Sequence, residues 1–220
     1  MVGPARRRSL GQAFGFRAAL KVRVVAGKWG GRTLRAPRGT SVRPTADRVR
    51  EAVFAILGDD VEGRVVLDLF AGTGAMAIEA LSRGAAGAVI VESSPVALNA
   101  LRANLAALEA ERRAVCLLLD FREAVRRLSA KRRTFDLVFL DPPYGKGLVG
   151  RSAELLSRAG VLAPGAVVVA ERALRDPGET LPAEWRERVD RRYGDTRITL
   201  YDIPEPRGQA SPGGRKQEKR

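Results

Sequence analysis

The feature that most constrains the fold is an apolar run that enters a glycine-rich turn at residues 65–74, Val-Val-Leu-Asp-Leu-Phe-Ala-Gly-Thr-Gly. Continuous apolar residues predict a buried strand, and the stretch 75–81 predicts a helix that stops at Gly84. Glycines at such a turn let the backbone approach a ligand closely, beside the free N–H groups of a helix N-terminus. This order of strand, turn and helix is typical of a parallel α/β sheet with a ligand at its edge.

Strands and helices alternate through the rest of the central region. Apolar runs predict strands at residues 64–70, 88–92, 113–119, 135–140 and 165–170. Helices fill the gaps, one of them over 95–110, and this alternation predicts a parallel sheet covered on both faces. Residues 185–193 and 197–203, joined by Gly194-Asp195, predict a closing antiparallel hairpin.

The positive charge is concentrated at the two ends of the chain. Residues 1–50 hold thirteen Lys and Arg and one acid, and residues 207–220 hold five basic residues and one acid. The stretch between them holds 21 basic and 23 acidic residues. Basic segments on a near-neutral domain are typical of polyanion binding, with an arginine-rich coding bias as the alternative explanation.

The basic N-terminal part has its own predicted structure. Residues 21–26 and 32–36 predict two strands around Gly-Lys-Trp-Gly-Gly, hence a hairpin. Thr45 is placed to cap a helix that runs to Leu57, with Gly58 as its stop.

Composition removes several classes of chemistry. The chain has no histidine and a single cysteine, Cys116. Ser-His-Asp hydrolysis, His-ligated zinc and a thiolate metal cluster are therefore excluded, and we expect no metal. No apolar run approaches the ~18 residues of a transmembrane helix, and no signal peptide is recognisable, so we expect a cytoplasmic protein that uses no membrane.

Four acids end successive predicted strands: Asp68, Glu92, Asp120 and Asp141. In an open α/β sheet, ligands bind at this edge. Asp68 could accept hydrogen bonds from a cationic amino group, and Glu92 could bind ribose hydroxyls, although a solvated strand end is the alternative for Glu92. Asp120 could take an adenine amino group, with the Phe121 N–H toward a ring nitrogen.

The glycine turn alone does not choose between cofactors. The pattern Gly72-x-Gly74-x-x-Ala77 also satisfies the dinucleotide fingerprint of nicotinamide enzymes. The carboxylate of Asp68, four residues before Gly72, would repel a pyrophosphate. The pattern therefore favours a cofactor with an amino group over a dinucleotide.

Residues 141–144 read Asp-Pro-Pro-Tyr and follow the strand at 135–140. The two prolines fix φ and remove two backbone donors, so the Asp141 carboxylate and nearby carbonyls project as acceptors. Tyr144 offers an aromatic face for a flat ring. The tetrapeptide is suited to holding a planar exocyclic amine, although an ordinary turn has the same composition.

Together these residues carry a family resemblance. Asp68, the Gly72-Thr73-Gly74 turn, Glu92 and Asp120 resemble class I S-adenosylmethionine-dependent methyltransferases, and residues 141–144 resemble their amine-methylating branch. Three further stretches, 25–32, 43–51 and 70–84, resemble the RsmD family, which methylates N2 of one guanine in 16S ribosomal RNA. The resemblance covers roughly residues 22–203, and Arg-Pro-Thr-x-Asp-Arg-Val-Arg-Glu at 43–51 is its most specific part.

The resemblance implies a fold and four segments. We expect a Rossmann-like, mostly parallel seven-stranded sheet with a C-terminal antiparallel hairpin and an N-terminal β-hairpin and helix. The predicted segments are a disordered extension at 1–20, an RNA-facing hairpin and helix at 21–58, the methyltransferase domain at 59–203, and a disordered basic tail at 204–220.

It also implies a reaction: methyl transfer from S-adenosylmethionine to guanine N2 of 16S ribosomal RNA, on an assembling small subunit and by a monomer. The expected catalytic residues are Asp141, Pro142, Pro143 and Tyr144. The expected cofactor residues are Asp68, Phe70, Gly72, Thr73, Gly74, Glu92, Asp120 and Phe121. The expected RNA contacts are Lys28, Arg32, Arg43, Thr45 and Arg48.

Three other functions stay open on the sequence. Methyltransferases with this tetrapeptide also act on DNA adenine or cytosine, or on protein glutamine, and the 43–51 segment argues against them. A nicotinamide-dependent oxidoreductase fits the bare glycine pattern but lacks an obvious proton donor in a histidine-free chain. A non-catalytic RNA-binding module would need only the basic ends, and the four strand-end acids argue against it.

Overall fold

The computed structural model describes residues 22–36, 44–176 and 178–205, with the backbone alone for 44–46. The extension predicted at 1–20 and nearly all of the tail predicted at 204–220 lie outside these ranges. Arg43 lies outside them as well.

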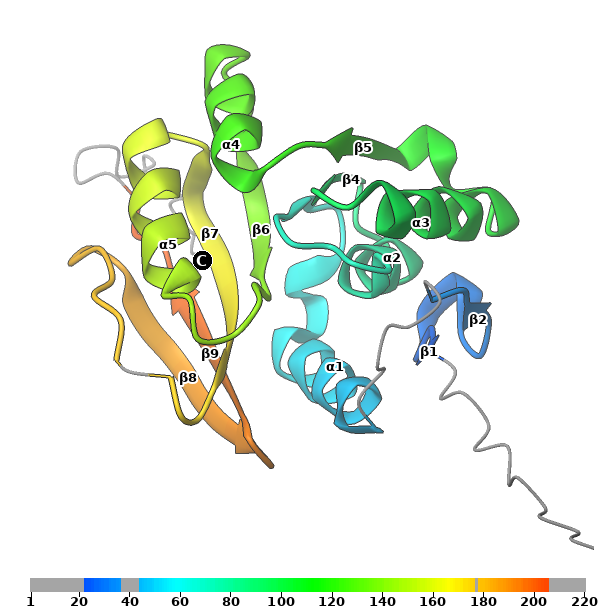
Figure 1. Cartoon of the computed structure of the whole chain (residues 1–220), viewed down its shortest axis with the longest axis horizontal. Coiled ribbons are helices and arrows are strands. Elements are labelled where there is room, and N and C mark those ends of the chain that lie inside the picture. Colours follow the sequence, from blue (N-terminus) through cyan, green and yellow to red (C-terminus); the bar gives the residue numbers. More distant parts are fainter. Residues whose placement is uncertain (1–21, 37–43, 177, 206–220) are drawn as a thin grey trace, which may run out of the picture.

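A single seven-stranded sheet organises the described part of the chain (Figure 1). Its strands are β3 (Val65–Asp68), β4 (Gly87–Glu92), β5 (Ala114–Leu118), β6 (Phe135–Leu140), β7 (Leu162–Ala173), β8 (Arg186–Tyr193) and β9 (Thr196–Asp202). The order is β5-β4-β3-β6-β7-β9-β8, with parallel pairs from β5 to β7 and antiparallel pairs on both sides of β9. The mostly parallel sheet and its C-terminal hairpin are confirmed.

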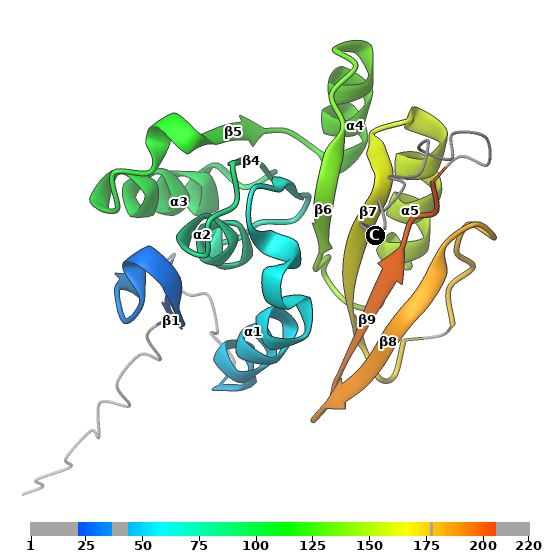
Figure 2. The same ribbon diagram turned by 180° about the vertical axis from the view of Figure 1, so that it is seen from behind.

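Helices cover both faces of the sheet, as the continuous apolar strands predict (Figure 2). The helices are α1 (Pro44–Leu57), α2 (Ala75–Ser82), α3 (Pro95–Ala107), α4 (Phe121–Ala130) and α5 (Leu148–Ala159). One core packs α1, α2 and α3 against Val66 of β3, and the other packs α4 and α5 against its neighbour Leu67. Successive strand residues face opposite sides, so each strand needs apolar residues throughout.

Some boundaries differ from the predicted ones for local reasons. Helix α3 ends at Ala107, three residues early, because Glu109 adopts φ 54° and the Ala110 N–H bonds the Leu105 carbonyl at 2.9 Å. Strand β7 is twice the predicted length, and its last residues pair with the start of β9. The C-terminal hairpin therefore extends β7 at the carboxyl edge of the sheet.

The N-terminal hairpin is real but short. Its strands are β1 (Val22–Arg23) and β2 (Thr33–Leu34), paired antiparallel, and the turn between them contains a 3-10 helix, η1 (Gly27–Trp29). The predicted strands at 21–26 and 32–36 are longer than this, because the N–H groups of Val25 and Ala26 bond Glu79 and that of Arg35 bonds Asn104. The prediction that Thr45 caps α1 is wrong, since α1 begins at Pro44 and Thr45 lies inside it.

The hairpin is fastened to α2 by two buried side chains. The Glu79 carboxylate accepts the N–H groups of Val25 and Ala26, at 2.6 and 3.0 Å. The Ser82 hydroxyl accepts from the Trp29 N–H at 2.9 Å and donates to the Ala26 carbonyl at 2.6 Å. A Cβ at Gly27, which has φ 77°, would lie 2.1 Å from the Ser82 carbonyl oxygen, so only glycine fits this contact.

Among the described residues, no helix is long and apolar enough to cross a membrane.

Candidate functional site

A cavity of about 480 Å³ opens at the carboxyl ends of the parallel strands. All four strand-end acids, Asp68, Glu92, Asp120 and Asp141, line it. The prediction that they gather at one edge of the sheet is confirmed. Its size lies in the range of small-molecule and cofactor sites.

The glycine turn forms one wall, and its two glycines serve different purposes. Gly72 has φ 55° with open space where a Cβ would project, and it lines the cavity with Thr73. Gly74 has φ 78°, and a Cβ there would lie 2.1 Å from a methyl carbon of Leu101. Gly72 thus leaves room at the cavity, whereas Gly74 lets α2 pack against α3; Gly74 is not among the cavity-lining residues.

Asp68 is buried at the end of β3, with 2% of its surface exposed. Its carboxylate accepts the Ala77 N–H of α2 at 3.3 Å. Burial raises the pKa of Asp68 to about 7, and the nearby Glu92 carboxylate adds to the rise, while backbone N–H groups of Ala77 and Phe70 oppose it. A cation bound nearby would therefore strongly favour the ionised form of Asp68 over the protonated form.

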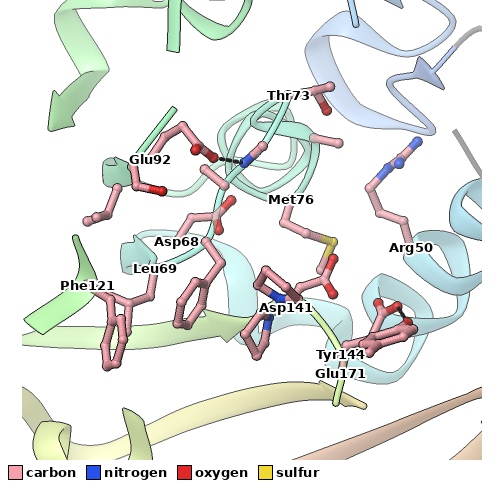
Figure 3. Close-up of a pocket in the computed structure, with 18 of the residues that line it drawn as sticks. Arg50, Asp68, Leu69, Thr73, Met76, Glu92, Phe121, Asp141, Tyr144 and Glu171 are labelled. Carbon is pink, nitrogen blue, oxygen red and sulfur yellow. Dashed lines mark hydrogen bonds between the residues drawn. The ribbon is translucent and has the colours of Figure 1, made fainter. Parts of the chain in front are cut away.

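Glu92, at the end of β4, is held by two backbone N–H groups. One carboxylate oxygen accepts from the Gly72 N–H at 2.8 Å (Figure 3). The other accepts from the Ser94 N–H at 2.7 Å. These bonds fix the carboxylate beside the glycine turn while each oxygen keeps a second lone pair. Glu92 is thus pre-oriented to accept from hydroxyl groups of a ligand in the cavity.

Asp120 and Phe121 begin α4 directly after β5. The Asp120 side chain is 54% exposed and caps the helix by accepting the Arg122 N–H at 2.9 Å. The Phe121 ring is buried, 5.3 Å from the ring of Phe70, and both rings line the cavity. This end of the cavity offers apolar rings with one acceptor at their edge, an arrangement that suits a flat heterocycle.

The tetrapeptide 141–144 forms the opposite wall. Asp141 is exposed and Pro142 is buried. The Tyr144 hydroxyl donates to Glu171 of β7 at 2.5 Å and lies 3.3 Å from the Thr196 hydroxyl of β9. Burial and the Glu171 carboxylate raise the pKa of Tyr144, so this hydroxyl stays a donor and its ring is held in place.

The segment after β7 also secures the tetrapeptide. The Asp176 carboxylate accepts the Gly145 N–H at 3.0 Å, and the Glu179 carboxylate accepts the Gly150 N–H. The tetrapeptide is therefore fixed from two sides, by β7 and β9 at the ring and by the segment after β7 at the following turn.

The residues predicted to contact RNA lie outside the cavity, where the structure describes their side chains. Lys28 is exposed, with its ammonium 5.6 Å from the Trp29 ring centre, and Arg48 is exposed on α1. The Arg32 guanidinium is exposed too, but it donates to the Ala107 carbonyl at 3.0 Å, at the end of α3. Of these three, none lines the cavity.

Several cavity residues were not identified from the sequence. Glu171 and Thr196 come from β7 and β9, whose pairing places them beside Tyr144. Arg50 lies within the segment 43–51 and faces the cavity from α1, together with Val49. The hydrophobic periodicity of α1 places Val49 on the apolar face of the helix, but it does not indicate that Arg50 faces the cavity.

Known proteins are similar to this chain in sequence and in structure. A family model described as "Conserved hypothetical protein 95" matches residues 22–202. "Ribosomal RNA small subunit methyltransferase D" of Escherichia coli K12 is 36% identical over 82% of this chain and 89% of its own, and the protein of that name in Haemophilus influenzae is 32% identical over 82% and 93%. The solved structure "Putative methyltransferase yhhF from Escherichia coli" covers 84% of this chain and 99% of its own at 34% identity, with a TM-score of 0.76.

Proposed function

This chain belongs to the RsmD family, and from that membership we propose that it transfers a methyl group from S-adenosylmethionine to the exocyclic N2 of a guanine in small-subunit ribosomal RNA. The observation that carries the proposal is one cavity lined both by the strand-end acids Asp68, Glu92 and Asp120 and by the Asp-Pro-Pro-Tyr segment. Membership of this family makes the chain a methyltransferase, and its Rossmann-like fold is that of class I methyltransferases.

The lining residues fit S-adenosylmethionine. Five lining side chains are acids, and Arg50 supplies a cation to the same lining. Such a lining complements a ligand with an amino group, a sulfonium, two ribose hydroxyls and one carboxylate. When bound, this cofactor supplies an electrophilic methyl group.

In this proposal, different residues bind the adenine, the ribose and the amino group of the cofactor. Phe70, Phe121 and Asp120 hold the adenine, and Glu92 holds the ribose hydroxyls. Asp68 accepts hydrogen bonds from the amino group. Gly72 and Thr73 give their backbone to the same wall, and Gly74 acts through the packing that sets the turn.

The catalytic residues act by positioning the guanine. Tyr144 provides a fixed face for the base. Pro142 and Pro143 fix the backbone angle φ and have no N–H group, so this stretch offers the base hydrogen-bond acceptors and no backbone donors. The Asp141 carboxylate accepts a hydrogen of the N2 amino group, which raises the electron density on a nitrogen whose lone pair is delocalised into the ring. Asp141 is exposed, so the proton that the amine releases on gaining the methyl group has a path to water. Positioning of this kind can supply ~7–11 kcal/mol of a barrier.

We propose that the hairpin and α1 face the RNA and that Lys28, Arg32, Arg43, Thr45 and Arg48 contact it. We further propose that the substrate is 16S ribosomal RNA within an assembling small subunit. The enzyme acts as a monomer without a metal, in the cytoplasm where these subunits assemble.

A methyl-acceptor comparison tests this function. Purified protein with methyl-tritiated S-adenosylmethionine is incubated with small ribosomal subunits, free ribosomal RNA, duplex DNA and a glutamine-containing protein fraction. We expect label in the RNA of the first two, incorporated ~100-fold or more slowly by the Asp141→Ala variant. Label in DNA or protein alone would replace the proposed substrate class.

A further inference from the structure

Arg50 is the single lysine or arginine among the described residues that line the cavity. It projects from α1 and is only 3% exposed, although arginine is rarely buried without full pairing. The acids Asp68 and Glu92 lie on the other side of the cavity from it (Figure 3). Two of the five lining acids thus lie across the cavity from its buried cation.

The guanidinium of Arg50 is only partly used by the protein. Within the described residues its hydrogen bonds run through Nη2, which donates to the Arg23 carbonyl and to Asp47 at 3.0 Å. Its Nε is buried without an acceptor and lies 3.7 Å from a carboxylate oxygen of Glu79, beyond hydrogen-bond distance.

Glu79 does not act as the hydrogen-bond acceptor of Arg50, because its carboxylate oxygens already accept from other donors. They accept the N–H groups of Val25 and Ala26, and the guanidinium of Arg83 donates to one of them at 2.8 Å. The donor capacity left for a ligand is therefore at Nη1, which makes no hydrogen bond within the described residues and, unlike Nε, is not fully buried.

We propose that Arg50 binds the carboxylate of the methionine part of S-adenosylmethionine, an inference that rests on the proposed function. Of the polar groups of that cofactor, the carboxylate alone is repelled by the strand-end acids, and it needs a cation away from them. Arginine matches a carboxylate in geometry and charge. An RNA phosphate is the less suitable occupant, because a side chain this deeply buried is reached by a small ligand and not by a polynucleotide backbone.

The test uses calorimetry to compare S-adenosylhomocysteine with its carboxyl methyl ester, which lacks the negative charge and carries one added methyl group. The wild-type protein should prefer the free acid by about 10- to 100-fold, the range for hydrogen bonds to charged groups. Arg50→Gln should weaken the acid by that factor and leave the ester unchanged, so that the preference disappears. Arg50→Lys keeps the charge but loses the planar fork, and it should fall between the two.

Arg83→Gln is the matched control, because Arg83 pairs with Glu79 but does not line the cavity. It should keep the preference for the acid. Thermal unfolding of each variant reports whether the fold survives. If Arg50→Gln does not fold, the wild-type preference and Arg50→Lys still decide.

Three results would overturn the inference. Equal affinity of the wild-type protein for the acid and the ester would show that the protein does not bind the carboxylate. Equal weakening of both ligands in Arg50→Gln would give Arg50 a role in holding α1 to the hairpin. Unchanged ligand affinity with a raised KM for RNA would assign it to a phosphate. Failure of the wild-type protein to bind either ligand would instead remove the cofactor, and with it the proposed function.

Discussion

At the scale of single residues, the charge state of Asp68 is coupled to its ligand. Burial raises the pKa of this carboxyl to about 7, so in the empty cavity it is largely protonated below that pH. A cationic amino group binds the ionised form, and binding below pH 7 must therefore release a proton.

From this follows a pH dependence of cofactor affinity. The affinity for S-adenosylmethionine should rise as the pH increases from about 6 to 7.5, because the fraction of ionised Asp68 rises. Asp68→Asn should bind weakly with a flat profile over that interval. Calorimetry in two buffers of different ionisation enthalpy measures the released proton; affinity that falls with pH over this interval would contradict the sign.

A second prediction at this scale separates chemistry from cofactor binding. Asp141→Ala should lower methyl transfer by ~100-fold or more, about 2.7 kcal/mol, because the amine loses its acceptor. Asp141→Asn keeps a carbonyl acceptor and should retain more activity. Single-turnover rates with calorimetric cofactor affinities check this. Lost cofactor binding with preserved turnover at saturating cofactor would place Asp141 in the cofactor part of the cavity.

At the scale of elements, β7 and β9 hold Tyr144 through Glu171 and Thr196. Glu171→Ala should lower methyl transfer by about 3- to 10-fold, the value of one hydrogen bond, and Glu171→Gln should lower it less because an acceptor remains. In a Tyr144→Phe background, Glu171→Ala should have little further effect. A double-mutant cycle on kcat and KM measures the coupling, and additive losses would show that Glu171 acts independently of the tyrosine.

The elements themselves were predictable because their signals are local. Apolar strands, the glycine turn and the strand-end acids follow from neighbouring residues, and β6 matches its predicted bounds at Phe135–Leu140. What the sequence does not show depends on pairing between distant segments. Glu171 reaches Tyr144 only because β7 lies beside β6 and β9, and Glu79 serves the hairpin through contacts over fifty residues apart.

At the scale of the whole molecule, the hairpin is fixed to the catalytic domain and is not a freely hinged arm. Its backbone bonds to Glu79 and Ser82 of α2, and Asn104 of α3 joins Arg35 to the glycine turn through Thr73. Residues proposed to face RNA are therefore held at a set distance from the cavity that holds the cofactor.

If this face binds phosphates, the salt dependence of RNA affinity should report it. Lys28→Gln with Arg48→Gln should reduce the slope of log K against log salt by about 0.7–0.9 for each phosphate that is no longer neutralised. Lys131→Gln with Arg133→Gln is the control of equal charge, since both residues are exposed at the amino end of β6, away from the cavity. Equal slopes for the two double variants would move the RNA-binding face elsewhere.

The identity of the methylated atom tests the central claim most directly. Small-subunit ribosomal RNA from cells with and without this protein is digested to nucleosides and fragments, and both are analysed by mass spectrometry. We predict one N2-methylguanosine that is present with the protein, absent without it, and not restored by the Asp141→Ala variant. An unchanged set of methylated guanosines, or a protein-dependent methyl group on another base, would contradict the account.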